Sequence, residues 1–136
     1  MKNLIWHIQK SFFQILNTNE KLVNLKVMTY SSIASNAKFP YILISFIKDF
    51  GDDVFNKKKQ AEIKISIFDN CESIKNISNI IDIIQDCINI DALNVNQENG
   101  INFVSLEKQS CEISNNIQYN STCGLISYNI IYEVLE

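Results

Sequence analysis

The side chains that could catalyse a reaction are few in this sequence and lie far apart along it. His7 is its single histidine and follows Trp6 in an amphipathic segment. A general base, or a nucleophile paired with histidine, would need this residue, but a structural or surface role suits its position better. Glycine-rich phosphate loops and Gly-x-Ser-x-Gly motifs do not occur in the sequence. We therefore expect no enzyme, no catalytic residues and no cofactor.

Patterns that could bind a metal ion are equally weak. The four cysteines lack the two-residue spacing of zinc sites; they are Cys71, Cys87, Cys111 and Cys123. We interpret them as buried or unreactive thiols, and a metal site or two disulfides are the alternatives.

A pair of carboxylates and a pair of tyrosines each have a structural interpretation beside a functional one. Asp82 and Asp86 lie one helical turn apart, which is typical of a solvated helix face, and a metal pair would need further ligands. Tyr128 and Tyr132 could form a binding platform, but their alternation with polar residues favours the buried face of a strand. We expect no metal site and favour core packing for the tyrosines.

The charge distribution disfavours nucleic acid as a ligand. The 136 residues carry a net charge of −3 and include no arginine, so no guanidinium group is available for bidentate phosphate contacts. The dense cationic run, Lys57 to Lys59, follows Asp49, Asp52 and Asp53, which favours a solvated loop over a phosphate site. The 24 isoleucines and 18 asparagines, like the lysines, indicate an A/T-rich genome.

Length and hydropathy indicate one soluble domain that spans residues 1–136. A chain of this size buries about two-thirds of its unfolded surface, enough for a core without disulfides or metals. Its apolar stretches are far shorter than the ~20 residues that cross a bilayer, and no signal-like apolar region follows the first lysine. We therefore expect a cytoplasmic origin and no membrane association.

A helix and a short strand are predicted for the first 30 residues. Apolar residues recur at steps of three and four between positions 4 and 16, and Asn17-Thr18-Asn19 ends the pattern. A strand is expected over 27–30.

Two strands joined by a long charged connection are predicted next. Residues 41–47 are apolar on both alternating faces, which predicts a strand covered on each side. Residues 61–69 place isoleucines on one face and polar residues on the other. The connection over 49–60 exceeds the usual two to five residues of a hairpin loop, which is typical of a loop that makes contacts. We define this connection as the hairpin tip, with these candidate interaction residues: Asp52, Asp53, Phe55, Lys57, Lys58 and Lys59.

A second amphipathic helix follows, with Asp69 or Asn70 as its predicted N-terminal cap. It ends near Asn89, and a polar connection over 91–100 closes on an Asn-Gly turn. Its apolar stripe consists of isoleucines: Ile74, Ile77, Ile80, Ile81, Ile84 and Ile88.

Two further strands complete the prediction. The first covers 101–113, with an interruption near 108–110, and the second ends the chain. One face of the last strand carries apolar or aromatic side chains: Ile126, Tyr128, Ile130, Tyr132 and Val134. The predicted order α-β-β-β-α-β-β indicates an α+β fold with a mainly antiparallel sheet packed against two helices.

Several of these features together form a family pattern. Phe39-Pro40-Tyr41 opens a strand, the charged hairpin loop follows, and Ser66-Ile67-Phe68-Asp69 leads from the next strand into a helix. With the N-terminal helix and the final strand, this pattern covers nearly the whole chain. It resembles the tail completion, or tail terminator, proteins of long-tailed bacteriophages and gene transfer agents. The sequence departs from that family in having no arginine.

The resemblance implies a structural role in virion assembly. Such proteins form a ring, commonly a hexamer, on the head-proximal end of a tail tube, where the ring stops tube growth and offers a docking surface to the head connector. The implied partners are other copies of the chain, the major tail tube protein and the head–tail connector. DNA would pass through the lumen without sequence-specific binding. The implied location is the bacterial host cytoplasm during assembly and then the virion tail, in a phage, a prophage or a gene transfer agent.

Two other classes of function stay open. One is a different head–tail joining, or neck, component of the same particle. The other is a non-viral adaptor or chaperone-like module for protein interactions. The hairpin tip is expected to contact a neighbouring subunit or the tube under the leading interpretation.

Overall fold

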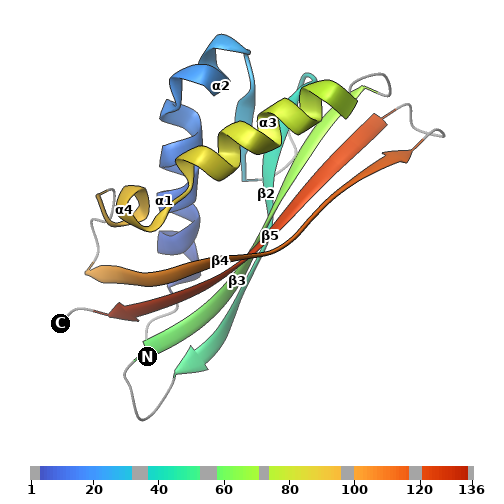
Figure 1. Cartoon of the computed structure of the whole chain (residues 1–136). Coiled ribbons are helices and arrows are strands. Elements are labelled where there is room, and N and C mark those ends of the chain that lie inside the picture. Colours follow the sequence, from blue (N-terminus) through green and yellow to red (C-terminus); the bar gives the residue numbers. More distant parts are fainter. Residues whose placement is uncertain are drawn as a thin grey trace.

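The chain folds into a twisted sheet with helices on one side, shown in Figure 1 as a computed structural model. The structure describes residues 4–31, 37–52, 58–70, 74–95, 100–116 and 121–134. The elements, in chain order, are α1 (Ile5–Thr18), α2 (Glu20–Asn24), β1 (Met28–Tyr30), β2 (Tyr41–Asp52), β3 (Lys58–Asn70), α3 (Ile74–Cys87), α4 (Ile90–Val95), β4 (Ile101–Asn116) and β5 (Ser121–Val134).

The strands form one five-stranded sheet in the order β1-β2-β3-β5-β4. β1 pairs with β2 in parallel, and the other three pairings are antiparallel. The helices gather on one side of this sheet (Figure 1). The α+β class and the mainly antiparallel sheet predicted from the sequence are therefore confirmed. The short helices α2 and α4 add to the predicted order.

Alternate residues of β3 and β5 form the face of the sheet that packs against the helices. Ile63, Ile65 and Ile67 are fully buried, as their period of two predicts. Their cross-strand neighbours on β5 are Tyr128, Ile126 and Gly124. The predicted buried face of β5 is confirmed from Ile126 to Tyr132, whereas Val134 at the strand end is exposed.

The prediction that β2 is covered on both faces is wrong, because the helices lie on one side only. A bulge at Ser45 shifts the register between Ile44 and Phe46, so the alternation changes phase within the strand. Ile42 and Ile44 are buried against the helices, whereas Phe46 lies on the other face and is 42% exposed. The strand has apolar residues at both alternating positions for two reasons. The bulge moves the more buried positions from even to odd numbers, and Phe46 is an exposed apolar residue.

The helix α3 begins later than the sequence suggests. Asp69 and Asn70 belong to β3, so the prediction that one of them caps the helix is wrong; the Asp69 carboxylate accepts the backbone N–H of Asn70 instead. Ile74, at the first turn, is 49% exposed rather than part of the buried stripe. The remaining five isoleucines of that stripe are buried, so the predicted packing face holds from the second turn onward.

The polar connection predicted over 91–100 contains a helix. Asn89 accepts the backbone N–H of Ala92 at 2.8 Å, a local bond that starts α4. At its end, the Asn94 amide exchanges two hydrogen bonds with the backbone of Phe103, at 2.7 and 2.9 Å, and so ties α4 to β4. The predicted interruption near 108–110 is a shift of register between Lys108 and Ser110 within one continuous strand.

Gly124 of β5 packs tightly against α3, and this contact generates a stability prediction. A Cβ atom there would lie 2.8 Å from Ile77 Cγ2 and 3.1 Å from Ile81 Cδ1. We expect Gly124→Ala to lower the free energy of unfolding by about 1–3 kcal/mol, because the packed helix cannot yield without strain. Urea unfolding measures the loss.

Ile77→Ala provides the control for this prediction, since it removes the methyl group that the new Cβ would meet. The double variant should lose less stability than the two single variants added together, because their shared clash disappears. Strictly additive losses would show that the close contact has no energetic effect.

Candidate interaction surface

The hairpin tip is shorter than predicted, because the two strands continue past the expected connection. β2 extends to Asp52 and β3 begins at Lys58, so residues 53–57 alone join them. Three of the candidate residues, Asp53, Phe55 and Lys57, lie outside the described residues. Of the others, Asp52 pairs with Lys59 at the end of the β2–β3 ladder.

Lys58 and Lys59 lie on a strand rather than on a charged loop, so the prediction of a solvated loop is wrong for these two residues. Lys58 is exposed and stands opposite Glu133 of β5. Lys59 points to the other face, opposite Tyr132, and is only 7% exposed. Neighbouring residues of a strand project to opposite sides, so the sequence run does not form one cationic patch here.

The two buried tyrosines of β5 differ in whether their hydroxyl groups have a hydrogen-bond partner. Tyr132 is fully buried and its Oη donates a hydrogen bond to Oδ2 of Asp49, 3.0 Å away, near the base of the tip. The Tyr128 hydroxyl is buried without a hydrogen-bond partner among the described residues. Burial raises the pKa of Tyr128 to about 12, with smaller contributions from Cys87 and Cys111. The core role favoured for both tyrosines is confirmed by this packing.

Replacing each tyrosine by phenylalanine should therefore change stability in opposite directions. We expect Tyr132→Phe to cost about 1.5–3 kcal/mol, because Asp49 loses a hydrogen bond to its carboxylate. Tyr128→Phe removes a buried hydroxyl without a partner and should stabilise the fold by about 1 kcal/mol. Urea unfolding at pH 7 of both variants measures the contrast, and equal losses would contradict it.

The pH dependence supplies an independent check on Tyr128. Its folded pKa is raised above the ordinary value of 10.0, so the folded state holds its proton while the unfolded state releases it. The free energy of unfolding is therefore unaffected by the titration of Tyr128 below pH 10, and it falls as the pH rises from 10 toward 12. The Tyr128→Phe variant should therefore lose less stability than the wild type over that range.

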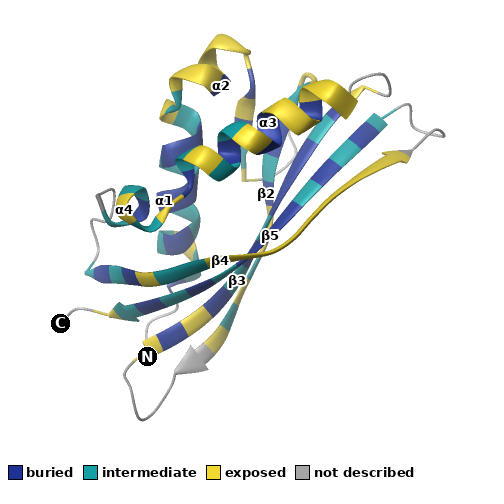
Figure 2. Ribbon diagram, viewed as in Figure 1, coloured by how far each residue is buried: buried dark blue, intermediate teal, exposed yellow. Residues whose placement is uncertain are grey.

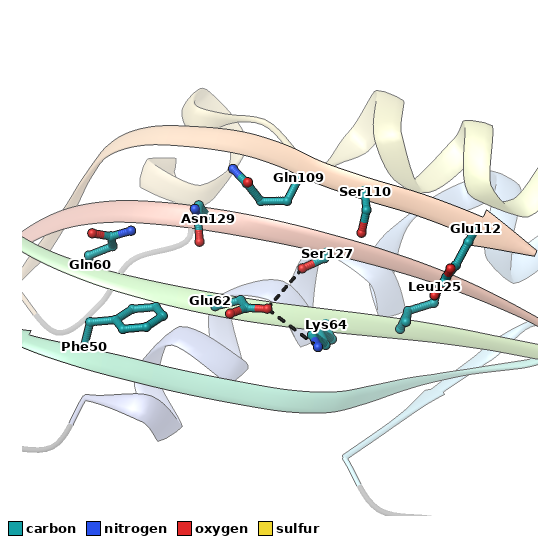
Figure 3. A pocket seen from close by; sticks show the side chains of 10 residues that line it. All are labelled: Phe50, Gln60, Glu62, Lys64, Gln109, Ser110, Glu112, Leu125, Ser127 and Asn129. Carbon is teal, nitrogen blue, oxygen red and sulfur yellow. Dashed lines mark hydrogen bonds and ion pairs between the residues drawn. The ribbon is translucent and has the colours of Figure 1, made fainter.

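The face of the sheet turned away from the helices, which we call the open face, carries the exposed side chains of the strands. Its polar part has residues from four strands around a shallow concavity of about 400 Å³ (Figure 3). Glu62 is its central group: it accepts a hydrogen bond from Ser127 at 3.3 Å and pairs with Lys64 at 3.7 Å. These partners compensate the charge of the carboxylate within the chain.

Aromatic residues occupy the open face along β2. Phe46 and Phe50 are 42% and 49% exposed. Lysine ammonium groups lie over both rings, Lys64 at 5.3 Å from Phe46 and Lys48 at 5.0 Å from Phe50. Aromatic side chains are enriched at surfaces that bind proteins, whereas lysines are depleted there. The sequence pattern does not reveal either ring as exposed, because Phe46 lies in a segment predicted to be a covered strand and Phe50 in a segment predicted to be a loop.

A stacked aromatic cluster closes the end of the open face near β1. The Tyr41 ring stacks with Phe68 at 5.2 Å and with Phe39 at 5.7 Å between centroids. Tyr30 meets Tyr41 edge-on at 5.9 Å. Phe39, which starts the Phe-Pro-Tyr motif, is exposed on this cluster. The motif therefore supplies aromatic surface where the parallel pair of strands begins.

The remaining candidates do not come together into a catalytic or metal site. His7 is half-buried against Trp6, and its Nδ1 has no hydrogen-bond partner among the described residues. Asp82 and Asp86 are exposed on α3, as predicted for a solvated face. In the described part of the chain, no three histidines, cysteines or carboxylates are grouped to hold a metal ion.

The described cysteines are free thiols, two of them half-buried and one exposed. Cys87 is half-buried, and burial raises the pKa of its thiol to about 11. Burial also raises the pKa of the half-buried Cys123, whereas Cys111 is exposed. Protonated thiols are poor nucleophiles and metal ligands, so the interpretation as unreactive thiols holds for Cys87 and Cys123. Cys71 lies outside the described residues.

Comparison with known proteins places this fold beside a virion component. No protein-family model matches the sequence, and no curated protein matches it. Among solved structures, the chain is similar to one from a structure described as the virion of a native gene transfer agent particle, with a TM-score of 0.74. The match covers 92% of this chain and 93% of that one at 12% sequence identity. None of the described helices has the length and apolar character to cross a membrane.

Proposed function

We propose that this chain is a structural virion-assembly protein that caps the head-proximal end of a phage-like tail tube. The observation that carries the proposal is the near-complete structural likeness to a chain of a gene transfer agent virion. The tail-terminator pattern of the sequence supports the position at the tail end. The coverage of both chains supports a role that uses the whole domain rather than a shared fragment.

The surface chemistry supports assembly rather than catalysis. The open face exposes the aromatic rings of Phe46 and Phe50, a residue type that is enriched in protein contacts. Capping then works as a binding equilibrium: the protein buries surface on the last tube ring and leaves no site for the next tube subunit. The partners in this proposal are a hexameric ring of the chain itself, the major tail tube protein and the head–tail connector. DNA passes through the ring without sequence-specific contacts.

Electron microscopy of tails assembled with and without this protein tests the proposal. A cap predicts tubes of irregular, extended length in its absence, and restored uniform length and head joining when the purified protein is added. Tubes of uniform length without the protein would refute capping. Uniform tubes that fail to join heads would instead favour the alternative of a neck component, and normal particles would favour an adaptor outside the virion.

The hairpin tip is proposed as a contact to a neighbouring subunit or to the tube. The connection lies at the opposite end of β3 from the β4–β5 turn, and the Tyr132–Asp49 hydrogen bond supports its base. The contact would use Asp52, Asp53, Phe55, Lys57 and the exposed Lys58, whereas Lys59, which is 7% exposed on the other face, would not take part.

Replacing residues 53–57 by a flexible glycine-serine segment of equal length tests the tip. β2 and β3 are kept intact, so the thermal unfolding temperature should stay close to that of the wild type. We expect at least a tenfold loss in binding to tube ends or in self-association, measured by sedimentation. A chain that caps tubes and oligomerises normally would show that residues 53–57 make no essential contact.

A further inference from the structure

Two edges of the sheet have no further described strand beside them. β4 is the last strand on one side, and its residues from Glu107 to Asn115 are all exposed (Figure 2). On the other side, β1 pairs with only three residues of β2, Tyr41 to Leu43. From Ile44 onward β2 has no described strand on its outer side. We call these two edges the β4 edge and the β2 edge.

The directions of the strands make these two edges complementary. β2, β3, β5 and β4 follow one another with three antiparallel pairings, so β2 and β4 run in opposite directions. If two copies stand side by side with their sheets in the same orientation, the part of β4 near Glu107 meets the β2 edge of the next copy in antiparallel fashion. Farther along β4, Glu112 to Ser114 are level with β1 of the next copy, so the contact with β2 ends before that point. Such a contact continues the ladder without inverting either copy.

The register of the sheet shows which residues would meet. Lys48 of β2 lies opposite Glu62, which lies opposite Asn129, and Asn129 lies opposite Glu107 of β4. Lys48 and Glu107 therefore stand at the same level on the open face, one at each edge, and both are exposed. Without stagger between copies, Glu107 of one copy lies beside Lys48 of the next. Opposite charges on directly facing strand positions stabilise the pair.

The bulges define a regular stretch at each edge. On β2 the register is unbroken from Phe46 to Asp49, between two shifts. On β4 it is unbroken from Ser105 to Lys108, again between two shifts. Through the sheet, these two stretches overlap in level around Lys48 and Glu107. Each edge thus has a stretch of regular register at the same level as the other. The charged side chains on these stretches discourage pairing with unrelated strands.

We propose that the β4 edge of one copy pairs antiparallel with the β2 edge of the next copy, with Glu107 beside Lys48. The contact joins two different edges, so it is heterologous and closes into a ring when the rotation between copies permits. The contact covers the β2 edge beyond Tyr41–Leu43, where β1 already pairs, and leaves the outer edge of β1 unpaired. This interface rests on the ring of the proposed function and specifies its subunit contact.

Charge reversal with mixing tests the pairing. Lys48→Glu alone sets glutamates against each other at every interface, and Glu107→Lys alone sets lysines against each other. Each variant should need about fivefold more protein to reach half assembly, or more. An equal mixture restores attraction at every interface, because chains of the two kinds alternate. Sedimentation velocity of the full-length chains measures the assembly.

A matched pair of variants on α3 controls for net charge. Lys75→Glu and Asp82→Lys make the same changes on an exposed helix surface away from both edges, and each alone should assemble like the wild type. If the wild type is a monomer in solution, binding of the same samples to tube ends replaces the sedimentation readout. A wild type that forms no ring in either setting overturns the proposal.

The outcomes separate this interface from the capping role. Normal assembly of both reversed chains, or a mixture no better than its components, overturns the edge pairing even where tails are still capped. Uniform tails made without the protein refute the capping role, whatever the reversed chains do.

Discussion

The structure depends on one layer of apolar packing between the helices and a single face of the sheet. Ile63, Ile65 and Ile67 of β3 and Ile126 of β5 are fully buried in it. Burial of a side chain of this size stabilises a fold by about 1.5–3 kcal/mol relative to exposure. The layer is thin where α3 crosses β5, and only a glycine fits there, since a Cβ at position 124 would meet Ile77 at 2.8 Å.

Because this layer is one-sided, the other sheet face and the sheet edges remain for contacts. The open face keeps Phe46 and Phe50 exposed, with lysines over their rings. The β4 strand continues beyond the cover of the helices as a fully exposed edge from Glu107 to Asn115 (Figure 2). The fold of a chain from a gene transfer agent virion is similar over nearly the whole length of this one.

Residues with a local signal were predicted well. The period of two in β3 and the isoleucine stripe of α3 from Ile77 onward were confirmed, because each reports a backbone geometry that is set within a few residues. The interaction surface was predicted less well. Lys59 appeared to belong to a charged loop, yet its strand continues and buries it opposite Tyr132. Phe46 appeared to be covered, yet it is on the open face.

The sequence by itself determined the class of fold, the main helices and strands, and the lack of arginine side chains. Side-chain period and residue type are local properties, and these conclusions need nothing more. Only the tertiary structure decided where β2 changes phase, where the hairpin strands end and which edges stay open. Each of these depends on the partner strand, because pairing across the sheet fixes the register. The bulge at Ser45 is defined by the pairing of β2 with β3. Lys48 and Glu107 lie at the same level because three successive strand pairings connect them.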